Sequence, residues 1–87
     1  MRLPQILDLA ATAPLASSLL GARGEPLHLD ASEVERLGGL CLQVLLAAQV
    51  QWRADGVEFS IVNSSAAFAE GVRLMAAHDL APREAVA

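Results

Sequence analysis

The chain has 87 residues, enough for one small domain, and its formal net charge is −4 at pH 7. Its six basic residues are all arginines and are scattered, whereas nucleic-acid binding needs clustered Lys or Arg, so the composition argues against a nucleic-acid partner. Cys41 is the only cysteine, which rules out a disulfide framework, and no apolar run approaches the ~20 residues that span a bilayer, so we expect a cytoplasmic protein without membrane insertion.

The first third of the chain carries a strand signal, a helix signal and a second strand signal. The short apolar segment Leu3–Leu9 predicts a strand. A helix is predicted to begin at Thr12, which can cap it, with Pro14 in the first turn, and to run through Leu20. The segment Pro26–Asp30 then alternates with period two, which predicts the second strand.

The rest of the chain predicts a long helix, a third strand and a third helix. The stretch from Ser32 to Glu35 has the form of a capping box, and the following helix is predicted to end at Asp55–Gly56. A strand is predicted over Val57–Asn63, and Asn63–Ser65 is predicted to cap the last helix. The predicted buried face of the long helix consists of Leu37, Leu40, Cys41, Val44, Leu45, Ala48 and Trp52, and that of the last helix of Phe68, Val72, Met75 and Ala76.

The predicted element order is β-α-β-α-β-α. Strands that are separated by helices cannot be joined by tight hairpins, so the order predicts an α/β fold with a short, mostly parallel sheet packed by helices. We expect residues 1–80 to form a single domain and residues 81–87 to form a flexible tail.

A second apolar row lies on the long helix. Leu42, Leu46 and Val50 recur at i, i+4 and i+8, roughly opposite or flanking the predicted core face. Such a row is a candidate interface for a partner or for a second copy in a homodimer. The alternative is that the helix is covered on both sides within the domain.

The sequence offers no arrangement that predicts catalysis. Gly38–Gly39 opens a helix, but no Lys-Ser/Thr follows as in a phosphate-binding loop, so a tight turn that lets the helix pack close to the sheet is the simpler interpretation. His28 and His78 have no ligand at metal-binding spacing, and no serine stands in a strained nucleophile turn. We therefore expect no enzyme activity, no cofactor and no metal.

The centre of the chain resembles the STAS domain family. The stretch Leu27–Leu40, the long helix and Asp55–Gly56 resemble the family's pattern of a strand followed by Asp-Ser-Ser/Thr-Gly-Leu at the start of the second helix. Aligning Gly39 and Leu40 on the family's Gly-Leu places Arg36 at the Asp, Leu37 at the first Ser and Gly38 at the phosphoacceptor. Gly38 has no hydroxyl, so the resemblance implies a family member without the usual phosphorylation. Ser32 is the nearest hydroxyl, and its Ser-x-x-Glu context favours a cap over a phosphosite.

The resemblance also implies a function in binding proteins. STAS domains bind partners, often histidine-kinase-like anti-sigma factors, and small lone members also resemble those linked to chemotaxis, where a chemotaxis kinase is the natural partner. The leading expectation is a non-catalytic module that resembles an anti-sigma factor antagonist; the alternative is a structural STAS subunit of a lipid-transport membrane ATPase. By resemblance the docking region comprises Asp30, Glu35, Arg36, Leu37, Gly38 and Gly39.

Overall fold

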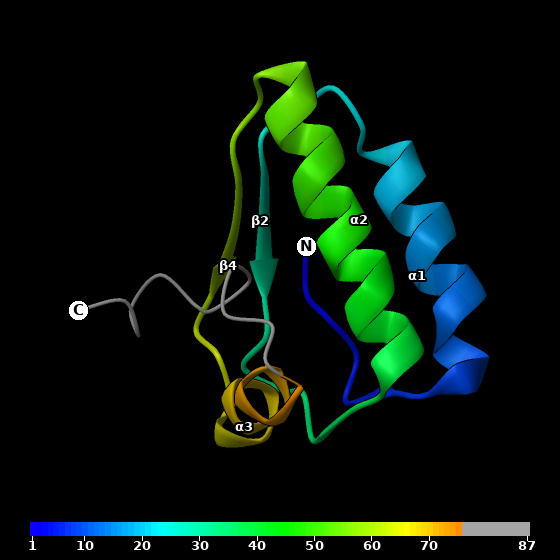
Figure 1. Cartoon of the computed structure of the whole chain (residues 1–87), viewed down its shortest axis with the longest axis vertical. Helices are drawn as coiled ribbons and strands as arrows, with labels where there is room; N and C mark the ends of the chain where they lie inside the picture. Colours follow the sequence, from blue (N-terminus) through cyan, green and yellow to red (C-terminus); the bar gives the residue numbers. More distant parts are fainter. Residues whose placement is uncertain (76–87) are drawn as a thin grey trace.

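The computed structural model describes residues 1–75, which form three helices and four short strands. In chain order these are β1 (Ile6–Leu7), α1 (Leu9–Gly21), β2 (Leu27–Asp30), β3 (Arg36–Leu37), α2 (Gly39–Asp55), β4 (Phe59–Val62) and α3 (Ala66–Leu74). The helices α1 and α2 lie side by side on one side of β2, and α3 crosses near one end of the domain (Figure 1). No helix of the described part is both long enough and apolar enough to cross a membrane. The predicted tail, residues 81–87, lies outside the described residues.

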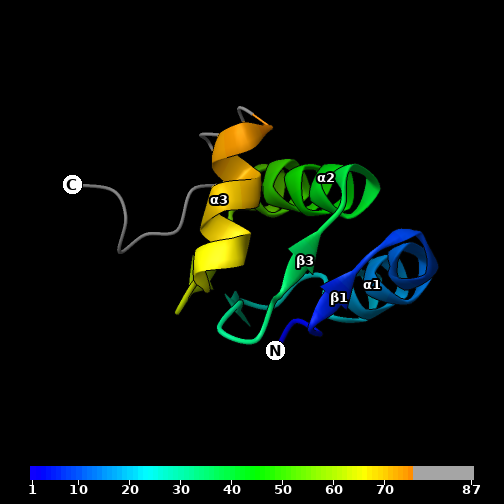
Figure 2. The same ribbon diagram turned by 90° about the horizontal axis from the view of Figure 1, so that it is seen from below.

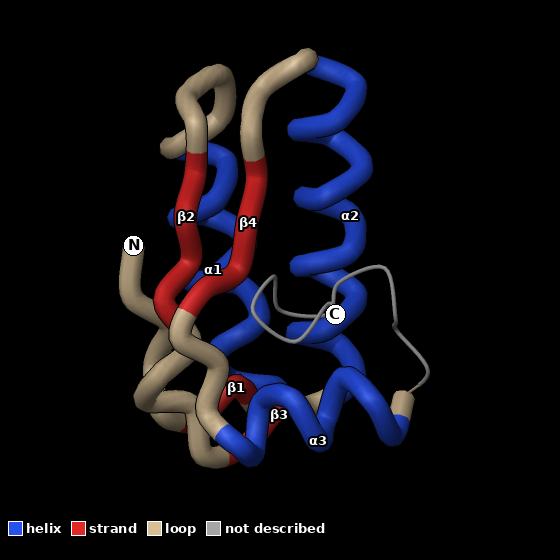
Figure 3. Tube along the Cα trace, turned by 90° about the vertical axis from the view of Figure 1, so that its left-hand side faces the viewer, coloured by secondary structure: helices blue, strands red, loops and turns tan. Residues whose placement is uncertain are grey.

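The strands pair in parallel, as the element order predicts. β2 pairs with β4 in a register that sets Leu27 opposite Phe59 and Asp30 opposite Val62, and the two strands run side by side in Figure 3. β1 pairs with β3, with Ile6 opposite Arg36. The connection from β2 to β4 contains α2, because a parallel pair needs a crossover rather than a tight turn. The α/β prediction with a short parallel sheet is therefore confirmed.

The N-terminal segment joins the two strand pairs, although only part of it is regular strand. An isolated parallel bridge connects Arg2 to Asp30, and the Leu3 N–H donates to the Asp30 carbonyl at 2.8 Å. Farther along, the Gln5 carbonyl accepts from the N–H of Glu35 at 2.7 Å. The continuous strand predicted over residues 3–9 is wrong, because the pairing passes from β2 to β3 around residues 4 and 5 and helix α1 begins at Leu9.

The start of α1 also differs from the prediction. The helix begins three residues before Thr12, because the Asp8 carboxylate caps it by accepting from the Ala11 N–H at 3.2 Å. An acidic cap also suits the positive end of the helix dipole. The Thr12 hydroxyl instead donates to the Asp8 carbonyl at 3.3 Å from inside the helix. Pro14 consequently lies within the helix rather than in its first turn.

The capping box predicted at Ser32 does not form. The Ser32 N–H donates to the Asp30 carboxylate at 2.9 Å, which closes a turn directly after β2. The chain then enters β3, and α2 begins only at Gly39 with Gly38 as its N-cap. The physical reason is that Arg36 and Leu37 pair with β1 as a strand, so the helix can begin only after this pair.

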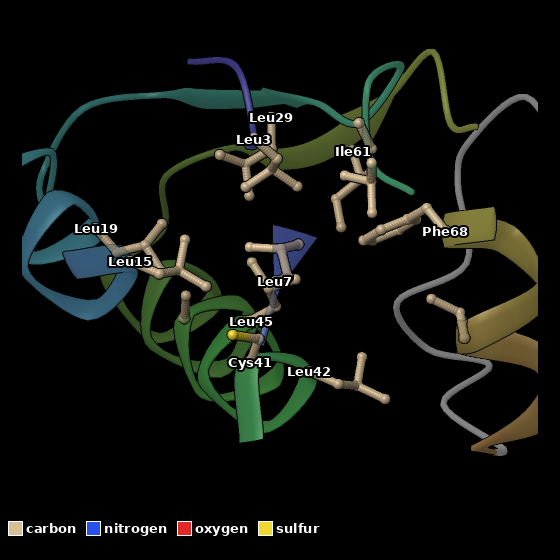
Figure 4. Close-up of a cluster of buried hydrophobic side chains, with 14 of the residues drawn as sticks. Leu3, Leu7, Leu15, Leu19, Leu29, Cys41, Leu42, Leu45, Ile61 and Phe68 are labelled. Carbon is tan, nitrogen blue, oxygen red and sulfur yellow. The ribbon is translucent and has the colours of Figure 1, made fainter. Parts of the chain in front are cut away.

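The hydrophobic core fills the space between the strands and the three helices. Figure 4 shows leucines from the N-terminal segment and β2, Ile61 from β4 and Phe68 from α3 converging on side chains of α1 and α2. The buried residues of the predicted faces are Cys41, Leu45, Ala48 and Trp52 on α2 and Phe68 and Val72 on α3. These positions confirm most of the predicted helix faces.

Four residues depart from those faces, and the first is Leu37, which is half-buried in β3 and does not belong to α2. Leu40, predicted in the core, is 51% exposed, because it stands in the first turn of α2 beyond the end of the sheet. Met75, predicted on the buried face of α3, is 38% exposed just past the end of the helix. Leu42, predicted on the outer row, is buried in the core cluster. Ala76, the last residue predicted for that face, lies outside the described residues.

The start of α3 is fixed as the sequence predicts. The Ser65 hydroxyl oxygen accepts from the Phe68 N–H at 3.0 Å, which caps the helix. The same hydroxyl donates to the Val34 carbonyl at 2.5 Å. The Ser65 N–H donates to the Ala31 carbonyl at 3.0 Å, so this residue ties α3 to the turn that follows β2.

Candidate functional site

The turn at the start of α2 is held against the end of β1. Gly38 is the N-cap of α2 and no side chain caps this helix end. The Gly38 N–H donates to the Leu7 carbonyl at 2.8 Å, and a Cβ at this position would lie 3.0 Å from the same oxygen. Glycine therefore lets the backbone at the start of α2 approach β1, which agrees with the interpretation of this glycine pair as a tight packing turn.

Exposed apolar side chains gather around this turn. The Asp8 carbonyl accepts from the Cys41 thiol at 3.3 Å, which sets the start of α1, with the exposed Leu9, beside the first turn of α2, with the exposed Leu40. A Cβ at Gly39 would lie 4.0 Å from the Met75 sulfur, so the end of α3 adjoins the same turn. We call this surface the end patch, and its exposed apolar side chains are Ile6, Leu9, Leu40 and Met75.

Charged residues of the predicted docking region border the end patch only in part. Arg36 lies opposite Ile6 in the β1–β3 pair, and its side chain is exposed. Glu35 precedes it and is also exposed. Asp30 stands elsewhere, at the end of β2 beside Arg2. The structure thus brings Glu35, Arg36 and the glycine pair together and leaves Asp30 apart from them.

Asp30 has a structural role in the turn after β2. Hydrogen bonds from the Ser32 hydroxyl and then from the Ser32 backbone N–H hold the pKa of the Asp30 carboxyl below its ordinary value of 3.8. The positive charge of Arg2 acts in the same direction. The carboxylate is thus ionised at neutral pH and already engaged within its own chain.

Leu37 is a packing residue rather than a free docking side chain. It is half-buried, and α3 passes over it at Gly71. A Cβ at Gly71 would lie 3.1 Å from a Leu37 methyl carbon, which shows how closely the two segments approach. Figure 2 shows β3 running toward the start of α2 between α1 and α3.

The predicted outer row of α2 is not a continuous surface. Leu42 is 3% exposed and Leu46 is half-buried against the core, whereas Val50 is 63% exposed. The row is covered because α2 has α1 along one side, while Leu42 points toward α3 on the other (Figure 4). Leu42 is therefore excluded as an interface residue, and the alternative of cover on both sides within the domain holds for this part of α2.

A second polar cluster lies on β2 and β4. His28 contacts the Ser60 hydroxyl through Nδ1 at 2.6 Å and the Glu58 carboxylate through Nε2 at 3.3 Å. Ser60 is 6% exposed and sits within a regular strand, whereas a catalytic serine needs an accessible oxygen on a strained turn. The cluster is therefore a cross-strand contact of the sheet. Among the described residues, no group of His, Cys, Asp and Glu is arranged to hold a metal ion.

The elements and the end patch define a small parallel α/β domain in which the start of the second helix is presented at one end of the molecule. The family model STAS_2, described as "Mlab, STAS domain", matches residues 1–82. The chain therefore belongs to the STAS domain family, whose members are protein-interaction modules and generally non-catalytic. A search of the curated proteins found no match, and a search of the solved structures found none either.

The sequence did contain signals for the apolar members of the end patch. Leu9 follows an aspartate that can cap a helix, which would put Leu9 at the first helical position. Leu40 directly follows a glycine pair, which favours a helix start at that point. Placing both helix starts correctly would have placed both leucines at the same end of the molecule.

Proposed function

We propose that this STAS domain is a non-catalytic, cytoplasmic docking module for a kinase-like regulatory protein, of the histidine-kinase-like anti-sigma factor or chemotaxis kinase class. The observation that carries the proposal is the end patch, in which exposed apolar side chains surround the start of α2. Apolar groups exposed together mark interaction surfaces more often than isolated ones do. Glu35 and Arg36 at its border supply charges that can orient a partner.

Docking in this proposal does not depend on phosphorylation of α2. Gly38 stands where the family carries its phosphoacceptor, and it has no hydroxyl. The tight approach of its Cα to the Leu7 carbonyl gives the glycine a packing reason to be there. Binding would then be regulated by the partner or by abundance rather than by a phosphoryl group on this turn.

A second candidate is a structural STAS subunit of a lipid-transport membrane ATPase. The description of the matching family names Mlab together with the STAS domain, and this is the observation that we add in support of this candidate. The end patch suits either role, because both require a surface that binds another protein. The two candidates differ in the protein that binds.

Affinity capture from native lysate, read by mass spectrometry, tests both candidates. The bait is the full chain, and the variant Leu40→Gln removes an apolar group from the end patch. Val50→Gln is the matched control, because Val50 is similarly exposed on the same helix but away from the turn. We expect a kinase-like regulator to be captured by the wild type and by Val50→Gln and to be lost with Leu40→Gln.

Two results would contradict the leading proposal. Capture of a membrane ATPase in a Leu40-dependent manner would favour the second candidate. Capture that is equally strong with Leu40→Gln would remove the end patch from the interface. Far-UV circular dichroism of each bait verifies that the substitutions leave the fold intact.

A further inference from the structure

A groove runs between α1 and α2, at a distance from the end patch along the helices. It has a volume of about 320 Å³ and is lined by the later turns of α1 and by residues from Val44 to Trp52 of α2. Buried Leu19 and Ala48 contribute to it together with the exposed Leu20 and Ala47. Figure 1 shows the two helices side by side, with α2 extending beyond the end of α1.

The helices that form the groove carry almost no charge. No acidic or basic residue occurs between Asp8 and Arg23, or between Arg36 and Arg53. Arg23 lines one end of the groove, and its guanidinium is paired with Asp55 at 3.2 Å. Burying an unpaired charge is costly, so whatever covers this groove must itself present an uncharged, apolar helix or loop.

The α1 helix of a second copy meets that requirement. It spans 13 residues without an ionisable side chain and displays Leu20, which is 71% exposed, at the rim of the groove. The neighbouring Ala16 and Ala47 leave space in the groove for a larger side chain. A two-fold interface needs a protruding group and a recess on one patch, and Leu20 and these alanines supply both.

Charge distribution also favours a second copy at this face. Each copy carries a net charge of −4, so two copies repel each other wherever their acidic surfaces meet. No acidic residue lines the α1–α2 groove, and Asp55 at its end is paired with Arg23, so the copies can approach there without like-charge contacts. We propose that the chain forms a homodimer in which the α1–α2 grooves of two copies face each other and Leu20 of each copy enters the groove of the other.

Sedimentation equilibrium of the purified full chain over a range of concentrations tests the dimer. Leu20→Lys places a charge at the rim of the groove, and a cation is tolerated near the C-terminus of α1. Val50→Lys is the matched control, because Val50 is 63% exposed on α2 and does not line the groove. We expect the wild type and Val50→Lys to dimerise equally and Leu20→Lys to weaken dimerisation by about ten-fold or more.

Salt provides a second readout. Because the interface is neutral and the copies are acidic, dimerisation should be unchanged or strengthened as ionic strength rises, whereas a charge-dependent contact weakens. A wild-type chain that stays monomeric up to about 1 mM overturns the proposal. A dimer that resists Leu20→Lys or dissociates with Val50→Lys also overturns it.

If circular dichroism shows that Leu20→Lys is unfolded, Ala47→Lys replaces it as the test variant, because Ala47 lines the groove from α2, and the same loss of dimerisation is expected. These measurements use no partner protein and no residue of the end patch. Their failure therefore leaves the proposed docking function standing, and failure of the capture experiment leaves the dimer standing.

Discussion

The two glycines at the start of α2 have different reasons to be glycine. At Gly38 an added Cβ would lie 3.0 Å from the Leu7 carbonyl oxygen, whereas at Gly39 it would lie 4.0 Å from the sulfur of the flexible Met75 side chain. Alanine is also a poor N-cap. We expect Gly38→Ala to lower the free energy of unfolding by about 1–2 kcal/mol, and Gly39→Ala to leave it unchanged or raise it by up to about 1 kcal/mol.

Urea unfolding followed by far-UV circular dichroism measures both changes, with each variant serving as the control for the other. Equal effects of the two substitutions would contradict the close approach at Gly38. A serine or threonine introduced at position 38 brings the same Cβ against the Leu7 carbonyl oxygen, so restoring a phosphoacceptor there requires the backbone to move by a few tenths of an ångström.

Asp30 gives the fold a dependence on pH. Its carboxyl pKa is lowered by the hydrogen bonds from Ser32, so the folded state favours the ionised form more than the unfolded state does. The resulting stability is present above the ordinary pKa of 3.8 and is lost as the pH falls through the lower folded value. We expect Asp30→Asn, which keeps a hydrogen-bond acceptor, to lose less stability than the wild type between neutral pH and the acid range below 3.8.

Unfolding in urea at pH 7 and again in that acid range checks this expectation. Asp8→Asn is a useful comparison, because Asp8 accepts a hydrogen bond at the start of α1 but lies in a different turn. An Asp30 variant as acid-sensitive as the wild type would show that this carboxylate does not contribute to the pH dependence.

At the level of elements, α3 depends on one serine. Ser65 caps the helix through Phe68 and also donates to the Val34 carbonyl, so Ser65→Ala removes the cap and leaves that carbonyl without this donor. We expect a loss of about 1–2 kcal/mol in the free energy of unfolding. Ser17→Ala, at an exposed position inside α1, is the control and should cost nothing.

Thermal or urea unfolding of the two variants, measured side by side, supplies the comparison. Because Phe68 belongs to the core and its N–H is the group that the Ser65 hydroxyl caps, loosening this helix start should also reduce hydrogen-exchange protection along α3. An unchanged stability of Ser65→Ala would mean that water or a neighbouring group replaces both bonds.

Elements with a strong local pattern could be predicted from the sequence. β2, the end of α2 at Asp55–Gly56 and the cap of α3 follow from alternation, turn chemistry and a serine before an apolar face. β3 could not, because two residues carry no periodicity and this strand exists only through its pairing with β1. The start of α1 was misplaced because Asp8 and Thr12 are both able to cap, and local sequence does not decide between them.

The burial of α2 shows a second limit of prediction from sequence, which concerns how much of a helix is covered. A helical wheel assumes one covered face, and on that assumption Leu42 belongs to the outside. In the folded chain α2 meets the sheet, α1 and the α3 side of the molecule together, so its covered arc is wider and Leu42 is buried. The predicted docking region at the start of α2 came from the family resemblance, whereas the apolar side chains around that turn come from helix ends that only the tertiary structure brings together.

For the molecule as a whole, the proposed function makes a simple chemical prediction. Incubation with a cognate anti-sigma kinase and ATP should leave the intact mass unchanged, because the turn at Gly38 offers no hydroxyl. Ser32 is the residue to watch, since it is exposed and does not cap a helix as its sequence context suggested. A mass gain of one phosphate that disappears in Ser32→Ala would show that the chain is phosphorylated after all, at a different site.

Residues 1–7 pair first with the end of β2 and then with β3, and this has a consequence for folding during synthesis. These residues leave the ribosome before their hydrogen-bonding partners, which are Asp30 and the segment from Glu35 to Gly38. Such distant pairings are slow to form, because a long loop must close before any bond is gained. Residues 1–7 must therefore wait until the chain as far as Gly38 has emerged, and β2 must wait for β4, so each strand is synthesised well before the strand with which it pairs.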